Sequence, residues 1–410
     1  MELRPYQKEI VTQGVQVLQK HRFLYLAMEV RTGKTITSLC IAASVKPKHL
    51  LFITKKKAIS SIESDYNMGS FFYDIVVINY ESLHKIPKHK YDVVICDEAH
   101  SMGAFPKPSK RAKQVKALLK FHNPYVILLS GTPTPESYSQ MYHQVYGIPT
   151  NPFSKYKNFY RFSDDYVHVE VRPIGVMYIR DYSGGLKSIL KSMKPYTISY
   201  TQKEAGFKVE TTENVLEVTM AEKTYHLIKQ LKKNLVIQGR EEVILGDTAV
   251  KLMSKLHQMY SGTVKFESGK SQVLDPTKAK YIKNKFAGKK IGIFYKFKAE
   301  LDALKKIFGK ELLTTTLEEF DSTDKNIALQ IVSGREGISL RNADALVYYN
   351  IDFSATSYWQ SRDRMTTKER LKNDVYWIFS KNGIEKKIYK AVTKKKDYTL
   401  NHFKTDFLSL

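Results

Sequence analysis

The feature of this 410-residue sequence that most constrains its fold is an alternation of short apolar runs with segments of helical periodicity. Five runs in the first third are rich in β-branched and aromatic residues, and each ends in a polar turn: 23–28, 50–54, 75–79, 91–96 and 125–130. Between the first two runs, Ile36, Leu39, Cys40 and Ala43 are spaced as on one face of a helix. Apolar strands that alternate with helices indicate a parallel sheet covered on both faces.

The last third of the chain repeats this plan. Its predicted strands are 291–295, 327–333, 345–350 and 375–379, and an apolar stripe of Phe297, Leu301, Leu304 and Phe308 predicts a helix after the first of them. The length agrees with two or three domains of about 150 residues. We therefore expect an α/β protein with two parallel-sheet lobes, residues 1–205 and 206–410.

The middle of the chain is less regular. Residues 147–205 contain several prolines and glycines, and we predict that they form a helical extension and linker of the first lobe. Their aromatic-rich stretch, 153–166, is predicted to be core, with base stacking at a DNA fork as the alternative. Residues 221–239 are predicted to form a helix that opens the second lobe.

Composition restricts the class of protein. Hydrophobic residues make up 42% and charged residues 26%, which excludes a disordered chain. No apolar run is long enough for a transmembrane helix, the first residues do not resemble a signal peptide, and two cysteines are too few for a disulfide framework. We expect a reduced, intracellular, cytoplasmic protein. The 66 Lys and Arg against 41 Asp and Glu give a net charge of +25, which suits a nucleic-acid partner but also a generally lysine-rich surface.

Two local patterns predict a nucleotide site. Gly33, Lys34 and Thr35 follow a predicted strand and open a predicted helix, as in a phosphate-binding loop, although the full pattern would have glycine where Met28 stands. Asp97 and Glu98, followed by Ala99 and His100, end the buried strand 91–96. Carboxylates at this end of a strand are placed for ligand chemistry. We expect Asp97 to hold Mg²⁺ and Glu98 to polarise the attacking water as general base.

With these motifs the chain resembles superfamily 2 DEAH-box helicases and translocases of the SNF2-like branch. Further stretches resemble the family's motifs in the family's order: 3–7, 29–35, 52–55, 79–83, 97–100, 130–133, 291–297, 333–340, 360–364 and the closing helix 383–389 with Lys394 to Lys396. The resemblance implies two RecA-like lobes with a cleft between them, ATP and Mg²⁺ as cofactors, and DNA as partner.

The resemblance also implies roles for individual residues. The implied catalytic residues are Lys34, Glu98, Gln360 and Arg364, the last as the cation for charge on the γ-phosphate. The implied nucleotide contacts are Arg4, Tyr6, Gln7, Arg31, Thr32, Gly33, Lys34, Thr35, Asp97, His100 and Gly337, with Gln7 reading adenine. The implied Mg²⁺ ligands are Thr35 and Asp97. The implied nucleic-acid contacts are Thr54, Lys55, Asn79, Tyr80, Ser333 and Arg335.

The sequence departs from the family pattern at two places. Arg31 stands where glycine is usual in the phosphate loop, and Thr367 stands where a second arginine is usual. The arginine that meets the γ-phosphate is therefore Arg364 or, failing that, Arg362 or Arg370. The basic run 107–120 contains no acid and either borders a DNA channel or forms a solvated helix face.

We expect a monomeric, DNA-dependent ATPase that moves on DNA and remodels forked or branched DNA in replication, recombination or repair. The compact chain resembles phage UvsW-like helicases, which migrate branches and reverse forks. The alternatives are a duplex translocase that drives a larger complex or a restriction system, an RNA helicase, and a DNA-binding module without catalysis.

Overall fold

The computed structural model describes residues 2–174, 177–334, 338–362, 364–367 and 369–394. The chain folds as two compact units, Met1–Phe207 and Lys208–Leu410. Within the described residues, no helix combines the length and the apolar character needed to cross a membrane.

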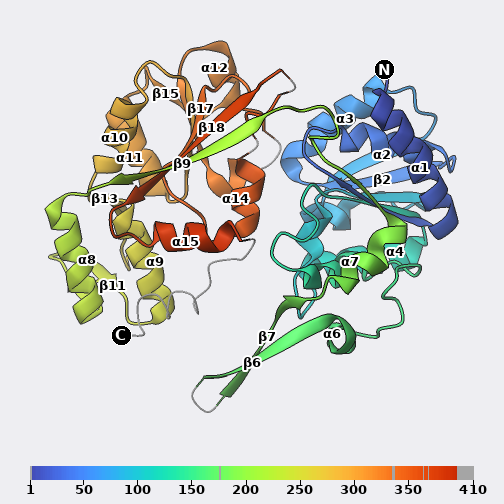
Figure 1. The fold of residues 1–410 in the computed structure, drawn as a ribbon, viewed down its shortest axis with the longest axis horizontal. Coiled ribbons are helices and arrows are strands. Elements are labelled where there is room, and N and C mark those ends of the chain that lie inside the picture. Colours follow the sequence, from blue (N-terminus) through green and yellow to red (C-terminus); the bar gives the residue numbers. More distant parts are fainter. Residues whose placement is uncertain (1, 175–176, 335–337, 363, 368, 395–410) are drawn as a thin grey trace. The chain divides into compact units, whose positions relative to one another are not determined.

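Unit 1 is built on a six-stranded parallel sheet with the order β3-β2-β4-β5-β1-β8. Its strands are β1 (Phe23–Met28), β2 (His49–Thr54), β3 (Asp74–Asn79), β4 (Val93–Cys96), β5 (Tyr125–Leu129) and β8 (Thr197–Tyr200). Its helices are α1 (Pro5–His21), α2 (Lys34–Ala43), α3 (Ile59–Met68), α4 (Lys110–His122), α5 (Met141–Val145), α6 (Phe159–Tyr166) and α7 (Ser188–Met193). Figure 1 shows α1, α2 and α3 beside this sheet and α6 next to the hairpin of β6 (Val167–Ile174) and β7 (Met177–Gly185).

Alternate residues of these strands enter two separate cores. Leu24, Leu26 and Ile95 pack with α1, α2 and α3 on one face, whereas Tyr25 and Val94 pack with α4, α5 and α6 on the other. Since both faces are covered, the strands are apolar throughout, as the sequence predicts. The helix α2 differs from its predicted stripe because Ile41 and Ala42 are buried and Cys40 and Ala43 only half-buried.

The middle segment contains strands where we predicted helix. After α6, β6 (Val167–Ile174) and β7 (Met177–Gly185) form an antiparallel hairpin, which projects from the rest of unit 1 in Figure 1. The chain then returns through α7 to β8, which pairs with β1 and becomes an edge strand of the main sheet. The aromatic stretch does form core, as predicted, because Phe153, Phe159 and Phe162 are buried.

Unit 2 has a second six-stranded parallel sheet, ordered β15-β16-β14-β17-β18-β9. Its strands are β9 (Glu210–Val218), β14 (Ile291–Tyr295), β15 (Leu313–Thr314), β16 (Asn326–Gln330), β17 (Ala345–Tyr348) and β18 (Lys372–Ser380). Two small hairpins pair β10 (Val236–Gln238) with β11 (Val243–Leu245) and β12 (Thr263–Lys265) with β13 (Ser271–Val273).

Helices cover both faces of this second sheet as well. They are α8 (Glu222–Asn234), α9 (Ala249–Tyr260), α10 (Thr277–Lys285), α11 (Lys298–Phe308), α12 (Leu317–Ser322), α13 (Ile331–Gly334), α14 (Ala355–Ser361) and α15 (Glu385–Val392). Residues of α10 and α11 pack on one face, and residues of α8, α9, α14 and α15 pack on the other. The two sheets confirm the expected α/β class with two RecA-like lobes.

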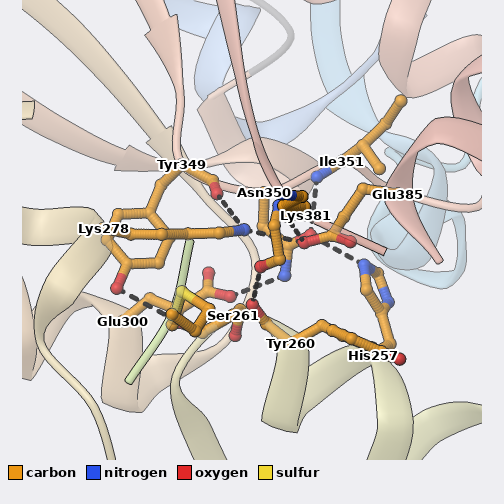
Figure 2. A network of polar contacts seen from close by, with 12 residues as sticks. His257, Tyr260, Ser261, Lys278, Glu300, Tyr349, Asn350, Ile351, Lys381 and Glu385 are labelled. Carbon is orange, nitrogen blue, oxygen red and sulfur yellow. Dashed lines mark hydrogen bonds and ion pairs between the residues drawn. The ribbon is translucent and has the colours of Figure 1, made fainter. Parts of the chain in front are cut away.

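A buried polar network ties several of these helices to β17. Lys278 on α10 and Glu385 on α15 form an ion pair of 2.7 Å with both side chains fully buried. Nearby, Asn350 donates to Glu300 of α11, and His257 of α9 lies 2.7 Å from the amide oxygen of Asn350 (Figure 2). Burial lowers the pKa of His257 well below its usual value, so this imidazole is neutral near pH 7.

Candidate nucleotide-binding site

The loop between β1 and α2 has the backbone of a phosphate-binding loop. Gly33 is the N-cap of α2 with φ +82°, in the left-handed region. A Cβ atom at this position would lie 2.2 Å from Nε2 of Gln7, so a side chain there would displace the Gln7 amide. Lys34 and Thr35 are the first residues of α2, where backbone N–H groups and the helix dipole favour an anion.

The ammonium group of Lys34 lies over this loop. Its Nζ donates to the carbonyl oxygen of Glu29 at 3.3 Å. It also lies 3.6 Å from the position that a Cβ of Gly131 would take. Gly131 follows β5, the neighbour of β1 in the sheet, so the loop and the chain after β5 enclose the lysine side chain from two sides.

The amino-terminal residues that the sequence predicts as base contacts pack against the loop. Gln7 is buried, and its Oε1 accepts a hydrogen bond of 2.9 Å from the backbone N–H of Arg4. The hydroxyl of Tyr6 donates to the carbonyl of Thr32 at 3.1 Å. The Thr32 hydroxyl is itself buried and donates to Glu29, so only the backbone of Thr32 faces these residues.

A segment that the sequence motifs do not include holds the start of the loop. The N–H of Glu29 donates to the carbonyl of Tyr200, and the carboxylate of Glu29 accepts a hydrogen bond of 2.7 Å from the N–H of Gln202. The side-chain amide of Gln202 donates to Val30 at 3.0 Å. Tyr200 also stacks on Tyr6 with ring centroids 4.9 Å apart. The strand β8 and the residues after it therefore hold both the loop and Tyr6, which the sequence predicts to contact the nucleotide.

Arg31 adopts a backbone conformation that usually requires glycine. Its φ is +65°, and the side chain is half-buried. The loop thus keeps the conformation expected where family members have glycine, at a cost of about 1–2 kcal/mol.

Two carboxylates follow β4 at the same edge of the sheet. Oδ2 of Asp97 accepts a hydrogen bond of 2.8 Å from the Thr54 hydroxyl, and the Asp97 carbonyl accepts one of 2.6 Å from Tyr80. Burial raises the pKa of Asp97 to about 6, and the charge of Glu98 adds to this rise. The Lys34 ammonium and the Thr54 hydroxyl oppose it. A bound cation would stabilise the ionised form of a carboxylate in this setting.

The second carboxylate connects to the chain after β5. Glu98 has φ +50°, and its Oε2 lies 3.2 Å from Nδ1 of His100. The same ring nitrogen lies 3.0 Å from Oγ of Ser130, which accepts a hydrogen bond from the N–H of Thr132. His100 therefore connects the acid pair with residues 130–133, one of the stretches that resemble a family motif.

Two of the predicted nucleic-acid contacts are wrong. The side chains of Thr54 and Tyr80 are fully buried, and both hydroxyls bond to Asp97. They support the acid pair and have no surface to offer a phosphate backbone. Lys55 and Asn79 are half-buried at the carboxyl ends of β2 and β3, at the same edge of the sheet as the loop, and their predicted contacts stay predictions.

Unit 2 holds the other predicted residues. Arg364 is buried, and its guanidinium donates to the carbonyls of Gln360 and Ile338 at 2.9 and 3.4 Å. Gln360 is buried on α14. Arg335 and Gly337 lie outside the described residues, and of Ser333 only the backbone, in α13, is described.

The two alternative arginines have structural partners. Arg370 donates to the carbonyls of Arg341, Ala343, Asp344 and Lys372. Arg362 lies 3.1 Å from the carboxylate of Glu213 and over the ring of Trp359. Because its guanidinium already donates to four carbonyls, Arg370 is a poor candidate for contact with the γ-phosphate.

The residues brought together fit ATP with Mg²⁺. The left-handed Gly33 leaves the N-terminus of α2 open, Lys34 lies over it, and Asp97 presents a carboxylate whose charge Lys34 favours. These are the donor types that phosphate groups and Mg²⁺ use in proteins.

Comparisons with known proteins agree with this site. Residues 1–66 match the family described as type III restriction enzyme, res subunit. The chain is also 22% identical over 383 residues to the CHD3-type chromatin-remodeling factor PICKLE of Arabidopsis thaliana. That match covers 83% of this chain and 26% of the relative, so the chain spans about a quarter of the relative's length. Residues 61–277, more than half of the chain, match the SNF2-related domain. The chain therefore belongs to the SNF2-related family of superfamily 2, the ATP-hydrolysing motors.

Proposed function

We propose that the chain couples ATP hydrolysis at the site in unit 1 to movement on DNA. The observation that carries the proposal is the placement of Lys34, Asp97 and Glu98 at one edge of a parallel sheet, beside a loop with a left-handed glycine. Nucleotide-hydrolysing enzymes with a phosphate-binding loop combine such a cradle with a lysine, a carboxylate that holds Mg²⁺ and a residue that positions the attacking water.

Each residue has a separate role in this proposal. The N–H groups of α2 and the Lys34 ammonium bind the phosphates, and Thr35 and Asp97 hold Mg²⁺. The metal, when bound, supplies Lewis-acid stabilisation of the phosphate oxygens. Glu98 accepts a proton from the attacking water, and His100 fixes the carboxylate through its contact of 3.2 Å. Gln7 and Tyr6 orient the base. The role of Arg364 as a cation for the γ-phosphate stays a prediction.

The substitution Glu98→Gln tests this assignment. It removes the proton acceptor but keeps the shape of the side chain, so we expect ATP turnover to fall by about 100-fold or more. Binding of a fluorescent ATP analogue should change little, because the phosphate contacts remain. Lys34→Ala is the matched control and should weaken binding of the same analogue. Unchanged turnover in Glu98→Gln would exclude Glu98 as general base.

We further propose that DNA is the track and that forked or branched DNA is the preferred substrate. The net charge of +25 favours association with a phosphate backbone. The steady-state ATPase rate should be compared without nucleic acid and with single-stranded DNA, linear duplex, a fork, a four-way junction and RNA. Preference for the fork or junction supports branch remodelling, and preference for RNA excludes the proposed track.

A second candidate is a duplex translocase that drives a larger assembly. The similarity to a chromatin-remodeling factor over most of this chain favours it. Equal stimulation by linear duplex and by junctions would support this candidate over branch remodelling.

A further inference from the structure

Unit 1 contains a cavity of about 360 Å³ that the proposed ATP site does not use. It lies between the C-terminal half of α4 and the chain that follows α5. Its polar rim includes Lys116, Lys120 and Lys157, and its wall includes Tyr142, Tyr146 and Phe153. The volume falls in the range of pockets that hold small ligands or single groups of larger ones.

The cavity lies near the amino-terminal ends of the strands, whereas the phosphate loop lies at their carboxyl ends. Residues 97 and 98 follow the carboxyl end of β4, and α4 then runs back so that its last residue, His122, comes just before β5 begins at Tyr125. The helix has 13 residues and is therefore about 20 Å long. Its C-terminal half, with Lys116 and Lys120, is thus well separated from Asp97 and Glu98.

The charges around the cavity lack acidic partners. In the parts of unit 1 that the structure describes, Lys116, Lys120 and Lys157 have no carboxylate within ion-pair distance. The sequence from 99 to 163 contains nine Lys and Arg and one acid, Glu136. The Lys116 ammonium lies 3.5 Å from the centroid of the Tyr146 ring, which orients this cation at the edge of the cavity. Three cations that line one cavity without a carboxylate nearby favour an anionic ligand.

The wall of the cavity indicates what the anion is attached to. Tyr142 and Phe153 are buried, Tyr146 is half-buried, and the polar atoms of Asn151 are bonded to the backbone of residues 148 and 153. The half-buried Tyr146 and Tyr156 therefore offer ring surface to a ligand beside the lysines, whereas Tyr142 and Phe153 belong to the core behind them. Lysines that contact phosphates, next to aromatic rings that contact bases and sugars, form the usual surface for a single DNA strand. An acidic peptide needs the cations but not the aromatic wall.

We propose that this cavity binds a phosphodiester of a DNA strand, as a second nucleic-acid contact of unit 1 at the edge of the sheet opposite the ATP site. The inference rests on the proposed action on DNA. A free nucleotide has the same chemistry as one unit of a strand, so the experiment includes both sources.

The test uses the full chain and the double substitution Lys120→Gln/Lys157→Gln. Both side chains are exposed, so the fold should be kept. The matched control, Lys20→Gln/Lys48→Gln, removes the same charge from exposed lysines outside the cavity. Binding of fluorescein-labelled oligo(dT) is measured by anisotropy at increasing NaCl. Each lost phosphate contact should reduce the slope of log K against log salt by about 0.7, so the double variant should lose about 1.4.

Protection of lysines from acetylation, measured by mass spectrometry, gives a second readout. We expect oligo(dT) to protect Lys116, Lys120 and Lys157 in the wild-type chain, and AMP and polyglutamate to leave them reactive. Equal protection by AMP would overturn the proposal of a DNA strand and indicate that the cavity binds a free nucleotide. Protection by polyglutamate alone would overturn it in favour of an acidic protein.

The proposal can fail separately from the proposed function. If DNA stimulates the wild-type ATPase, but the cavity variant keeps the wild-type salt slope and the lysines stay reactive, the cavity inference is wrong and the DNA motor remains. If the wild-type chain neither binds DNA nor responds to it, the proposed function fails and the inference fails with it.

Discussion

The Thr54 hydroxyl donates a hydrogen bond of 2.8 Å to Oδ2 of Asp97, which joins the carboxyl ends of the neighbouring strands β2 and β4. The bond favours the ionised form of this carboxylate and so opposes the effect of burial, which raises the pKa of Asp97 to about 6. Thr54 therefore acts on the proposed Mg²⁺ ligand and is not a contact for the nucleic acid.

Substitution of Thr54 should shift the pH dependence of ATP turnover. The pKa of Asp97 is raised to about 6, so the ionised form that binds Mg²⁺ is lost as the pH falls through about 6. Thr54→Val removes a contact that lowers this pKa. The acidic limb of the curve of ATP turnover against pH should therefore move upward by about one pH unit. Thr54→Ser keeps the hydroxyl and should behave as wild type. An acidic limb that stays in place in Thr54→Val would show that the bond does not control Asp97.

Gly33→Ala should weaken nucleotide binding. The φ of +82° is unfavourable for alanine, and its Cβ would lie 2.2 Å from Nε2 of Gln7, so either the loop or the Gln7 amide that we propose orients the base must move. We expect the Kd of a fluorescent ATP analogue to rise about tenfold or more. Gly269→Ala is the control, since Gly269 has φ +90° with open space around it. It should lose similar stability while the Kd stays unchanged, and a change in its Kd would mean that general strain explains both variants.

The effects of substituting Lys278 and Glu385, the buried ion pair of unit 2, on the free energy of unfolding should be strongly coupled. Glu385→Gln leaves the Lys278 ammonium buried without its counter-charge, and we expect a loss of about 3–5 kcal/mol in the free energy of unfolding. The double substitution Lys278→Met/Glu385→Gln removes both charges and should recover part of this loss. Denaturant unfolding of the two single variants and the double variant measures the coupling. Additive losses would mean that the two side chains act independently.

Much of the fold follows from patterns that are local in the sequence. The strands β1 and β14 have the predicted bounds because their apolar runs begin and end with the strands. The prediction of a strand over 327–333 is wrong after Gln330, because Ile331 and Val332 continue the apolar run but belong to α13. There Ile331 is buried and Val332 is exposed, which a short sequence window does not reveal.

Other elements depend on partners that are distant in the sequence. The first five residues of β9 are all polar, so the strand has no apolar pattern of its own, and it gains its place by pairing with β18, more than 150 residues later. Gly184, one of the glycines in the irregular segment 147–205, lies within β7. A Cβ there would lie 2.3 Å from the carbonyl oxygen of His168, its partner on β6, so this pairing requires glycine.

The same division applies to the site. The motifs predict Lys34, Asp97 and Glu98 because their spacing from the strands is local. They do not predict Gln202, whose contact with Glu29 spans 173 residues and carries no local signal. The buried positions of Thr54 and Tyr80 were missed for a related reason, since a residue at the end of a strand looks equally suited to binding a ligand and to supporting its neighbour.

Substitutions of Arg370 and Arg364 in unit 2 should distinguish a structural role from a catalytic one. Arg370, just before β18, donates to the carbonyls of residues 341, 343 and 344. Arg370→Gln should therefore lower the free energy of unfolding by about 1–3 kcal/mol, with turnover per folded molecule unchanged at low temperature. If Arg364 meets the γ-phosphate, Arg364→Lys should lower turnover by about 1000-fold while ATP binding changes far less. Comparing kcat with the denaturant midpoint for both variants decides between the two roles. A large loss of kcat in a stably folded Arg370→Gln variant would transfer the catalytic assignment to Arg370, despite its four carbonyl contacts.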